Sequence, residues 1–275
     1  MGPVAQGVKS ENGMNKIRLR RWKSYVDLAN FLALVSLKSE ARESILSYAW
    51  WVLEPLSQLL LFYVAFGVLM LRGDHSDQYL PSLFCGLVAW RWFSNGVMIG
   101  SKALTQNAQF LRSFRLPTIV FVLSRFQESI IRIFPILTML IVYCLWVTPT
   151  AASSLLWLVP VILTLMVSIL AVTTMTSWIS VYVPDIVNII DIGLRAGLFL
   201  SGVFYSIKDL SPAHQEIMLL NPMAVIIESF RLVLIDGTPP HVYRLATIFA
   251  TCVVIALINY RQHRKLAGKL ASMLN

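Results

Sequence analysis

Six long apolar segments dominate this chain of 275 residues and limit what it can fold into. They cover about residues 48–71, 79–101, 117–147, 153–182, 186–206 and 243–260. A helix that spans a bilayer needs roughly 20 mainly apolar residues, and each segment approaches or exceeds that length. The segments lack the period-two alternation of barrel strands. The sequence therefore predicts an all-α integral membrane protein whose six transmembrane helices occupy residues 48–262.

The composition excludes several soluble classes. Hydrophobic residues make up 57% of the chain and charged residues only 13%, whereas an ordinary soluble domain is about 25% charged. We therefore exclude a soluble enzyme, a disordered chain and a conventional DNA-binding domain, despite the net charge of +9. No nucleic-acid partner is expected, and the positive charge is interpreted as a signal of membrane orientation.

Lysine and arginine residues gather at both ends of the chain and in residues 102–116. Cytoplasmic loops of membrane proteins carry an excess of these residues. We therefore expect both termini and the 102–116 loop to face the cytoplasm, in agreement with an even number of spans. Residues 1–21 and 263–275 are predicted to be cytoplasmic tails, the first of them flexible.

Residues 22–47 are predicted to form an amphipathic helix followed by a linker. Apolar residues recur at three- and four-residue spacing over residues 22–38, where Trp22 and Tyr25 alternate with Lys23 and Asp27. Such a helix suits the cytoplasmic membrane interface. The alternative is a short seventh span, which would place the termini on opposite sides.

The linker of residues 207–242 is too apolar for a solvated loop, yet Pro212, Asn221-Pro222 and Glu228 interrupt it. Two short helices broken at Asn221-Pro222 fit this pattern. Broken backbone at membrane depth is tolerated where it is buried in protein or lines a watery path. We expect a re-entrant segment that borders a pathway; a lipid-facing hairpin is the alternative.

Charged residues inside spans are costly and point to function. Glu54 and Arg91 lie at similar depths on antiparallel spans, so we expect an ion pair. Arg125, Glu128 and Arg132 form one stripe of the long third span, where pairing within the helix is expected. Pro135 is the predicted kink of that span.

Aromatic residues are dense in the first two spans. Sugars present apolar C–H faces that stack on aromatic rings, so an aromatic-lined path could pass a glycan. Lipid contact and interfacial anchoring are the alternative.

Signals of catalysis or metal binding are lacking in the sequence. The four histidines fall in predicted loops or the tail, and Cys85, Cys144 and Cys252 lie in apolar runs as expected for buried free thiols. No phosphate-binding G-x-x-x-x-G-K-[ST] motif occurs. We expect no metal, no cofactor bound by this chain and no enzyme activity of its own.

An ordered set of short motifs runs through the chain. In chain order these are Trp50-x-x-Leu53-x-Pro55, the run Gly86 to Asn95, the run Asn107 to Arg112 followed by Pro117, Pro184-Asp185, the run Ser201 to Ser206, Leu220-Asn221-Pro222, and Arg231. The set resembles the permease subunits of ABC exporters for bacterial surface polysaccharides, the group that exports O-antigen, teichoic acid and capsule. The resemblance covers nearly the whole chain from about residue 22. Three positions depart from the family pattern, since Ser47 replaces a glycine and Ala89 and Gly202 each replace a proline.

The resemblance implies a multi-pass protein of the bacterial inner membrane that works as a homodimer. Two copies of a separate cytoplasmic ATPase subunit would bind ATP and Mg and drive export of a lipid-linked polysaccharide, with O-antigen favoured. It also implies that spans one, two and five line the path. The candidate path residues are Trp50, Trp51, Glu54, Phe62, Tyr63, Trp90, Arg91, Trp92 and Phe93.

The resemblance also assigns roles at the two ends of the path. Residues 102–116 are similar to the coupling helix that seats in the ATPase, and the helix of residues 22–38 is similar to the interface helix beside it. The coupling candidates are Asn107, Phe110, Leu111, Arg112 and Arg115. The outer gate candidates in and beside residues 207–242 are Tyr205, Asn221, Pro222, Glu228 and Arg231. Arg42 and Arg91 are candidates to hold the lipid pyrophosphate.

Three other functions, from two classes, remain open. A permease of a drug or small-lipid ABC exporter belongs to the same broad class. A proton-coupled glycolipid flippase or a membrane glycosyltransferase belongs to a different one, although such proteins usually have more spans, an inverted repeat or a carboxylate-rich loop.

Overall fold

The computed structural model describes residues 25–39, 47–65, 78–113 and 116–272. Regular structure in these ranges is helical, without strands. Besides a helix over residues 25–39, the elements are α2 (Ser47–Phe62), α3 (Tyr79–Ser101), α4 (Ala103–Gln106), α5 (Ala108–Ser113), α6 (Thr118–Val147), η2 (Pro149–Trp157), α7 (Leu158–Tyr182), α8 (Ile186–Leu200), η3 (Ile207–Asp209), α9 (Pro212–Met218), α10 (Pro222–Leu234) and α11 (Val242–Ser272). The all-α class is confirmed.

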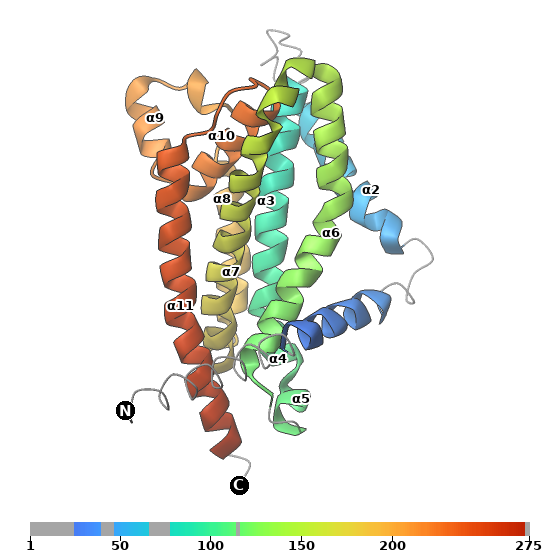
Figure 1. The fold of residues 1–275 in the computed structure, drawn as a ribbon, viewed down its shortest axis with the longest axis vertical. Helices are drawn as coiled ribbons and strands as arrows, with labels where there is room; N and C mark the ends of the chain where they lie inside the picture. The colour runs from blue at the N-terminus through green and yellow to red at the C-terminus, as the bar shows by residue number, and fades with distance from the viewer. Residues whose placement is uncertain (1–24, 40–46, 66–77, 114–115, 273–275) are drawn as a thin grey trace, which may run out of the picture.

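The long helices run alongside one another in a bundle (Figure 1). The short helices α4 and α5, the helix of residues 25–39 and the C-terminal end of α11 lie at one end, called here the lower end. The short helices α9 and α10 lie towards the opposite, upper end. This arrangement separates two groups of candidate residues, since the described coupling candidates and the gate candidates lie at opposite ends.

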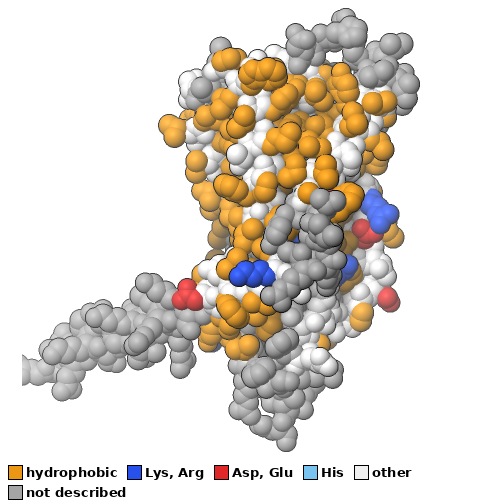
Figure 2. Space-filling view, turned by 90° about the vertical axis from the view of Figure 1, so that its right-hand side faces the viewer, with side chains coloured by type: hydrophobic (Ala, Val, Ile, Leu, Met, Phe, Trp, Pro, Cys, Tyr) orange, Lys and Arg blue, Asp and Glu red, His pale blue; other side chains and the backbone are white. Residues whose placement is uncertain are grey.

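The surface of the bundle is apolar. The side chains of Leu156 and Trp146 are 83% and 80% exposed, and many other large apolar side chains are exposed beside them. Figure 2 shows hydrophobic side chains covering the upper part of one face, with the charged side chains in view lying lower. A water-soluble monomer rarely exposes so large an apolar area, so lipid is the natural solvent of this surface.

Three described helical segments are long and apolar enough to cross a membrane: residues 118–147, 153–182 and 242–265. The pair α9 and α10, bent by 109°, would make a fourth. The other three predicted spans do not pass the same test. The described parts of α2 and α8 have only 16 and 15 residues, and α3 carries Arg91, Ser94 and Asn95 in its middle.

The centre of the bundle depends on close contact between α3 and α7. A Cβ atom on Gly96 would lie 2.7 Å from Ile169 Cγ2, and one on Gly100 would lie 2.0 Å from Thr173 Cγ2. These two glycines form a G-x-x-x-G pattern, which lets the backbones of membrane helices approach closely. The polar segment of α3 is thereby held in the middle of the molecule.

The helix α10 is enclosed by protein. Its residues Met223 to Leu234 are all buried, and it packs against α3, α7 and η2. Pro222 occupies its first turn, and the Asn221 side chain accepts a hydrogen bond from Met223 N at 3.0 Å. The prediction of two short helices broken at Asn221-Pro222 is confirmed.

The fifth predicted span ends earlier than expected. We expected it to reach residue 206, but α8 stops at Leu200. Gly202 has a φ of +69°, which turns the chain out of the helix. Asn221 Nδ2 donates to the free carbonyl of Leu200 at 3.1 Å, so the end of α8 and the start of α10 stabilise each other.

The structure bears on two other expectations without contradicting them. The C-terminal tail predicted from residue 263 begins as helix, because α11 continues to Ser272, and His263 is buried. The helix α6 continues through Pro135, and Figure 1 shows the helix changing direction along its length.

The helix of residues 25–39 lies across the lower end of the bundle (Figure 1). Ala29, Ala33 and Leu37 form its buried side, whereas Phe31 and Leu34 are exposed on the other side. It packs near α4 and α6 rather than running through the bundle. An exposed apolar side on such a helix fits the predicted position at a membrane interface.

Candidate functional site

Arg91 in the middle of α3 is the centre of a polar groove. Its Nη2 atom lies 2.7 Å from Glu54 Oε1, so the predicted ion pair is confirmed. Its Nη1 donates to Gln58 Oε1 at 2.8 Å. Arg91 lines a cavity of about 220 Å³ between α2, α3 and α8, which Asp191 and Arg195 also line. We call this cavity and its lining the Arg91 groove.

Sequence reasoning missed three members of the groove: Gln58, Asp191 and Arg195. Asp191 and Arg195 form an ion pair at 2.6 Å, and 79% of the Arg195 side chain is exposed. The signal was available, because opposite charges four residues apart in an otherwise apolar helix are costly in lipid. Their exposure on α8 requires water or another protein surface against this face.

A smaller cavity of about 80 Å³ lies on the other side of α2, between α2, α3 and α6. Arg91 and Glu54 line it together with Trp51 and Arg132. The Arg132 guanidinium lies 5.5 Å from the centre of the Trp51 ring, a cation–π contact. The Arg91–Glu54 pair therefore links two polar spaces across α2.

The charged stripe on α6 pairs within the helix, as predicted. Glu128, which is buried, accepts from Arg125 at 2.7 Å and from Arg132 at 2.5 Å. Arg125 also donates to Ser36 Oγ at 2.9 Å, and to Gln106 Oε1 at 3.3 Å. The stripe thus ties the helix of residues 25–39 and α4 to the long helix α6.

The aromatic candidates of α3 are packing residues as much as lining residues. Trp90 and Trp92 are buried in the core, and each lines one of the two cavities described above. Phe93 lies 5.8 Å from Trp90, ring centre to ring centre. A Cβ atom on Gly197 would lie 2.7 Å from the Trp90 ring, so α8 rests directly on this indole.

The aromatic candidates of α2 are more open. Trp50 and Tyr63 have exposed rings. Phe62 packs edge-on against Phe204, with ring centres 4.8 Å apart. The structure therefore does not gather all the aromatic candidates along one surface.

The described coupling candidates lie at the lower end. Asn107 separates α4 from α5, and its side chain donates to Ala103 O at 2.8 Å. Leu111 is buried in an apolar cluster with Ala103, Leu104 and residues at the start of α6. Phe110 and Arg112 lie on α5, but their side chains are outside the described part of the chain, as are Arg115 and Arg42 altogether.

His263 joins three helices just above these elements, a role that the sequence did not suggest. Its Nδ1 lies 3.1 Å from Thr118 Oγ1 on α6, and its Nε2 lies 3.3 Å from Ser177 Oγ and 2.9 Å from Thr174 O on α7. The buried ring thus holds α11 to the base of the bundle through hydrogen bonds to two neighbouring helices.

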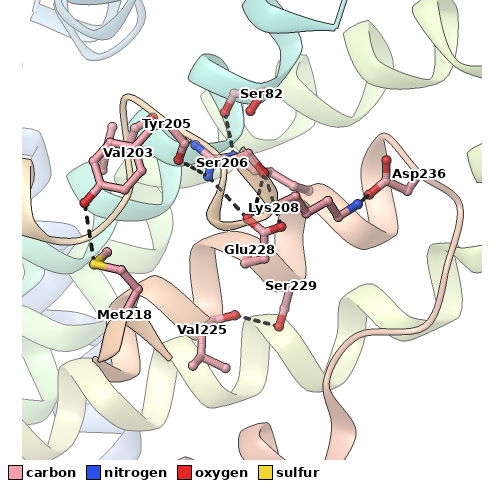
Figure 3. Close-up of polar contacts among 11 residues, drawn as sticks. Ser82, Val203, Tyr205, Ser206, Lys208, Met218, Val225, Glu228, Ser229 and Asp236 are labelled. Carbon is pink, nitrogen blue, oxygen red and sulfur yellow. Dashed lines mark hydrogen bonds and ion pairs between the residues drawn. The ribbon is translucent and has the colours of Figure 1, made fainter. Parts of the chain in front are cut away.

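Three of the gate candidates, Tyr205, Glu228 and Arg231, contact one another, and Figure 3 shows the Tyr205 and Glu228 side of this cluster. Asn221 and Pro222 lie at the other end of α10. Arg231 binds backbone carbonyls. Its Nη1 and Nη2 donate to Tyr205 O and Val203 O, each at 2.9 Å, and its Nε donates to Ser82 O at 3.2 Å. Arg231 is 4% exposed. We call this set of bonds the Arg231 clasp; it fixes the chain after α8 against α3.

Gly86 permits the clasp. A Cβ atom at this position would lie 2.9 Å from Val203 O and 3.1 Å from Arg231 Nη2. Glu228, one turn before Arg231, faces it at 3.4 Å. Tyr205 donates to Met218 Sδ at 3.5 Å, which links the turn to α9.

Metal binding finds no support in the described residues, which contain no group of three or more His, Cys, Asp or Glu side chains able to hold an ion. The cysteines are free; Cys85 and Cys144 are buried and Cys252 is partly exposed.

A helical bundle with an apolar outer surface, a charged groove between α2, α3 and α8, and a short helix enclosed by protein is typical of a membrane transport protein. The chain belongs to the ABC-2 type transporter family, whose pattern matches residues 31–235. The match runs from the helix of residues 25–39 through α10.

Relatives within this class are similar over most of the chain. Two O-antigen export system permease proteins from Klebsiella pneumoniae are 22% and 20% identical, each over 90% of this chain and 95% of the relative. One from Myxococcus xanthus is 26% identical over 87% of this chain and 92% of its own length. These relatives are transporter permeases rather than enzymes.

Proposed function

We propose that this chain is the channel-forming membrane subunit of an ATP-driven exporter that moves a lipid-linked polysaccharide, with O-antigen favoured, across the bacterial inner membrane. The observation that carries the proposal is the Arg91 groove, which presents charged and amide side chains at membrane depth on an exposed face. Family membership and the similarity to O-antigen export permeases support the choice of cargo.

The proposed topology has six spans, formed by α2, α3, α6, α7, α8 and α11, with both termini in the cytoplasm. The short helix α8 then crosses a thinner or locally hydrated region, which its polar neighbours favour. Lys102, Arg261, Arg264 and Lys265 belong to lower-end elements, in keeping with a cytoplasmic lower end.

The active particle is proposed to be a homodimer in which α2, α3 and α8 of the two copies face each other. Every residue of α8 is at least partly exposed in the single chain. A second copy packed against this helix would shelter Asp191 and Arg195 from lipid. The path would then run between the two Arg91 grooves.

Two copies of a cytoplasmic ABC ATPase are the proposed energy source, with ATP and Mg bound there. The α4–α5 hairpin is proposed to seat in the ATPase through Asn107, Phe110, Leu111, Arg112 and Arg115. Movement of this hairpin would reach α6, α7 and α11 because Leu111 packs on the start of α6 and His263 ties the three helices together.

The lipid pyrophosphate is proposed to meet Arg42 and Arg91. Since Glu54 already neutralises Arg91 at 2.7 Å, a pyrophosphate would have to compete with that carboxylate. Among the aromatic residues, Trp50 and Tyr63 are the exposed rings that we propose to contact the glycan, while Trp90 supports α8. The clasped turn after α8, with α9 and α10, is the proposed outer gate.

A first experiment tests the proposal as a whole. The gene is deleted in its native host, and surface polysaccharide and the lipid-linked precursor inside the cell are measured. Loss of the surface polymer with accumulation of its lipid-linked form, restored by the plasmid-borne gene, is expected. An unchanged surface polymer would rule out the proposed cargo.

A second experiment separates a polysaccharide exporter from a drug or small-lipid exporter. The tagged chain is crosslinked in intact membranes and purified, and co-purification of an ABC ATPase is expected. The ATPase rate of the complex is then measured with the lipid-linked glycan and with unrelated lipids or drugs. Stimulation by the small molecules alone would favour the second class.

A further inference from the structure

A cavity of about 660 Å³ lies at the upper end of the chain, outside the Arg91 groove. The first turn of α3, the turn that follows α8 and the last turn of α10 form its walls. Its volume falls in the range of about 300–1,000 Å³ typical of small-molecule sites. Figure 3 shows Ser206, Glu228, Lys208 and Asp236, which line it, turned towards one another.

The charges that line this cavity are balanced. Lys208 forms an ion pair with Asp236, and Glu228 faces Arg231 at 3.4 Å. Arg231 already donates to three backbone carbonyls. These described lining residues therefore offer no spare positive charge, and the cavity suits a neutral polar ligand better than a phosphate.

Glu228 has unused acceptor capacity. The residue is 2% exposed, and its carboxylate receives only two hydrogen bonds from the described residues, from Ser206 Oγ and Arg231 Nη1, each at 3.4 Å. Both distances are long, whereas a buried carboxylate normally accepts several bonds below 3 Å. A ligand that brings hydroxyl donors into the cavity would satisfy this carboxylate.

Aromatic rings line the same cavity. Tyr79, Phe204 and Tyr205 surround it together with the polar groups of Ser82 and Ser206. Paired polar groups beside aromatic surfaces match the two sides of a sugar ring, whose hydroxyls donate and accept hydrogen bonds and whose C–H face is apolar.

We propose that this cavity is a saccharide-binding subsite at the exit of the path, which holds one or two neutral sugar units of the glycan through Glu228, Ser206 and Tyr205. The proposal rests on the proposed function, which places the upper end outside the membrane and supplies the glycan. Such a subsite would slow backward movement of the polymer between successive cycles of ATP hydrolysis.

The test measures protection of a cysteine by glycan in the complete exporter. Ser206→Cys is introduced into a Cys252→Ala background, and right-side-out membrane vesicles are treated with a membrane-impermeant maleimide. Ser211→Cys is the matched control, because Ser211 begins the next short helix and does not line the cavity. The probe is the host's own surface polysaccharide, released from its lipid carrier.

The expected result is labelling of both cysteines, with Ser206→Cys alone slowed by glycan. The slowing should be about tenfold when the glycan is at about ten times its dissociation constant. Inorganic phosphate should not protect. Equal labelling with and without glycan, protection by phosphate, protection of Ser211→Cys as well, or no labelling of Ser206→Cys from outside would each overturn the proposal.

A second variant guards against misfolding. Lys208→Cys lies at the exposed rim of the cavity and should show the same protection if Ser206→Cys does not assemble. Failure of this inference is distinguishable from failure of the proposed function. If glycan does not protect the cysteines but gene deletion abolishes the surface polymer, only the proposed subsite is wrong. If gene deletion leaves the surface polymer unchanged, the proposed cargo is wrong.

Discussion

Arg231 is the hydrogen-bond donor to the turn that follows α8 and to the first turn of α3. The carbonyls of Val203, Tyr205 and Ser82 come from two segments far apart in the sequence, and one planar guanidinium satisfies all three. A lysine has the charge but not the geometry. The clasp therefore depends on the identity of the side chain as well as on its charge.

Arg231→Lys should destabilise the protein strongly. The lysine keeps the charge but could reach only part of the clasp, and each buried carbonyl left without a donor costs about 1–3 kcal/mol. Arg244→Lys is the control, since Arg244 makes one long bond of 3.4 Å, to Leu219 O. Thermal unfolding in detergent, followed by tryptophan fluorescence, should show a much larger fall in the unfolding midpoint for Arg231→Lys than for Arg244→Lys. Equal falls in the midpoint would mean that the Arg231 clasp does not stabilise the protein.

Glu54→Gln should strengthen binding of the lipid-linked substrate if Arg91 binds its pyrophosphate. The change removes the negative charge that competes for the Arg91 guanidinium. The substrate concentration that gives half-maximal ATPase stimulation should fall severalfold. Asp185→Asn, an exposed change at the start of α8, should leave that concentration unaltered. If that concentration is unchanged or higher for Glu54→Gln, Arg91 does not bind the pyrophosphate.

Ion pairs that follow from helical spacing or from the depth of a residue in its span were predictable from the sequence. The Glu54–Arg91 pair followed from the depth of two antiparallel spans, and the α6 stripe followed from helical spacing. The Arg231 clasp was not predictable, because its acceptors are backbone carbonyls whose positions depend on the turn at Gly202 and on the absence of a side chain at Gly86.

At the scale of elements, one small residue lets α8 lie directly against α3. Gly197 lets the helix approach the Trp90 ring, whereas Gly193, one turn earlier, has no atom within 4 Å of a would-be Cβ. The two glycines therefore offer a matched comparison on one helix.

Gly197→Ala should push α8 away from α3 and lower the unfolding midpoint. Gly193→Ala should be neutral or stabilise slightly, since alanine is favoured over glycine in a helix by about 0.5–1 kcal/mol. Thermal unfolding of the two variants in detergent measures the difference. Matching midpoints would mean that the Gly197–Trp90 contact does not position α8.

Element boundaries were harder to predict than element types. The break between α9 and α10 was predictable because Asn221-Pro222 carries a local signal. The end of α8 was not, because the apolar run continues through residues 201–206 while the backbone turns at Gly202. Hydropathy shows only where the chain is apolar. Residues 201–204 are buried by protein, and their sequence is as apolar as that of a segment surrounded by lipid.

At the scale of the whole molecule, the exposed faces differ in chemistry. The outer face of α11 is apolar, as at Leu257, whereas α8 exposes Ile192 between the charged residues Asp191 and Arg195. If two copies meet along α8, the exposed face of α8 should lie close to the same face of the second copy, and the outer face of α11 should not.

Ile192→Cys in a Cys252→Ala background should form a disulfide between two copies in native membranes. Leu257→Cys, at a similarly exposed apolar position, should not. Copper-phenanthroline oxidation followed by non-reducing gel electrophoresis measures this. A dimer band for Leu257→Cys instead would place the dimer contact on α11.

The enclosure of α10 has a consequence for how the chain is built. Its walls come from α3, η2 and α7, all made before it, while α11 is made after it. A short helix with a buried Glu228–Arg231 pair is a poor substrate for release into lipid by the translocon. The earlier helices must therefore pack together first, and α10 then folds back into the space between them. Chains that end shortly after Leu234 and have been released from the ribosome should already protect α10 from protease, and unprotected chains would mean that α11 has to insert first.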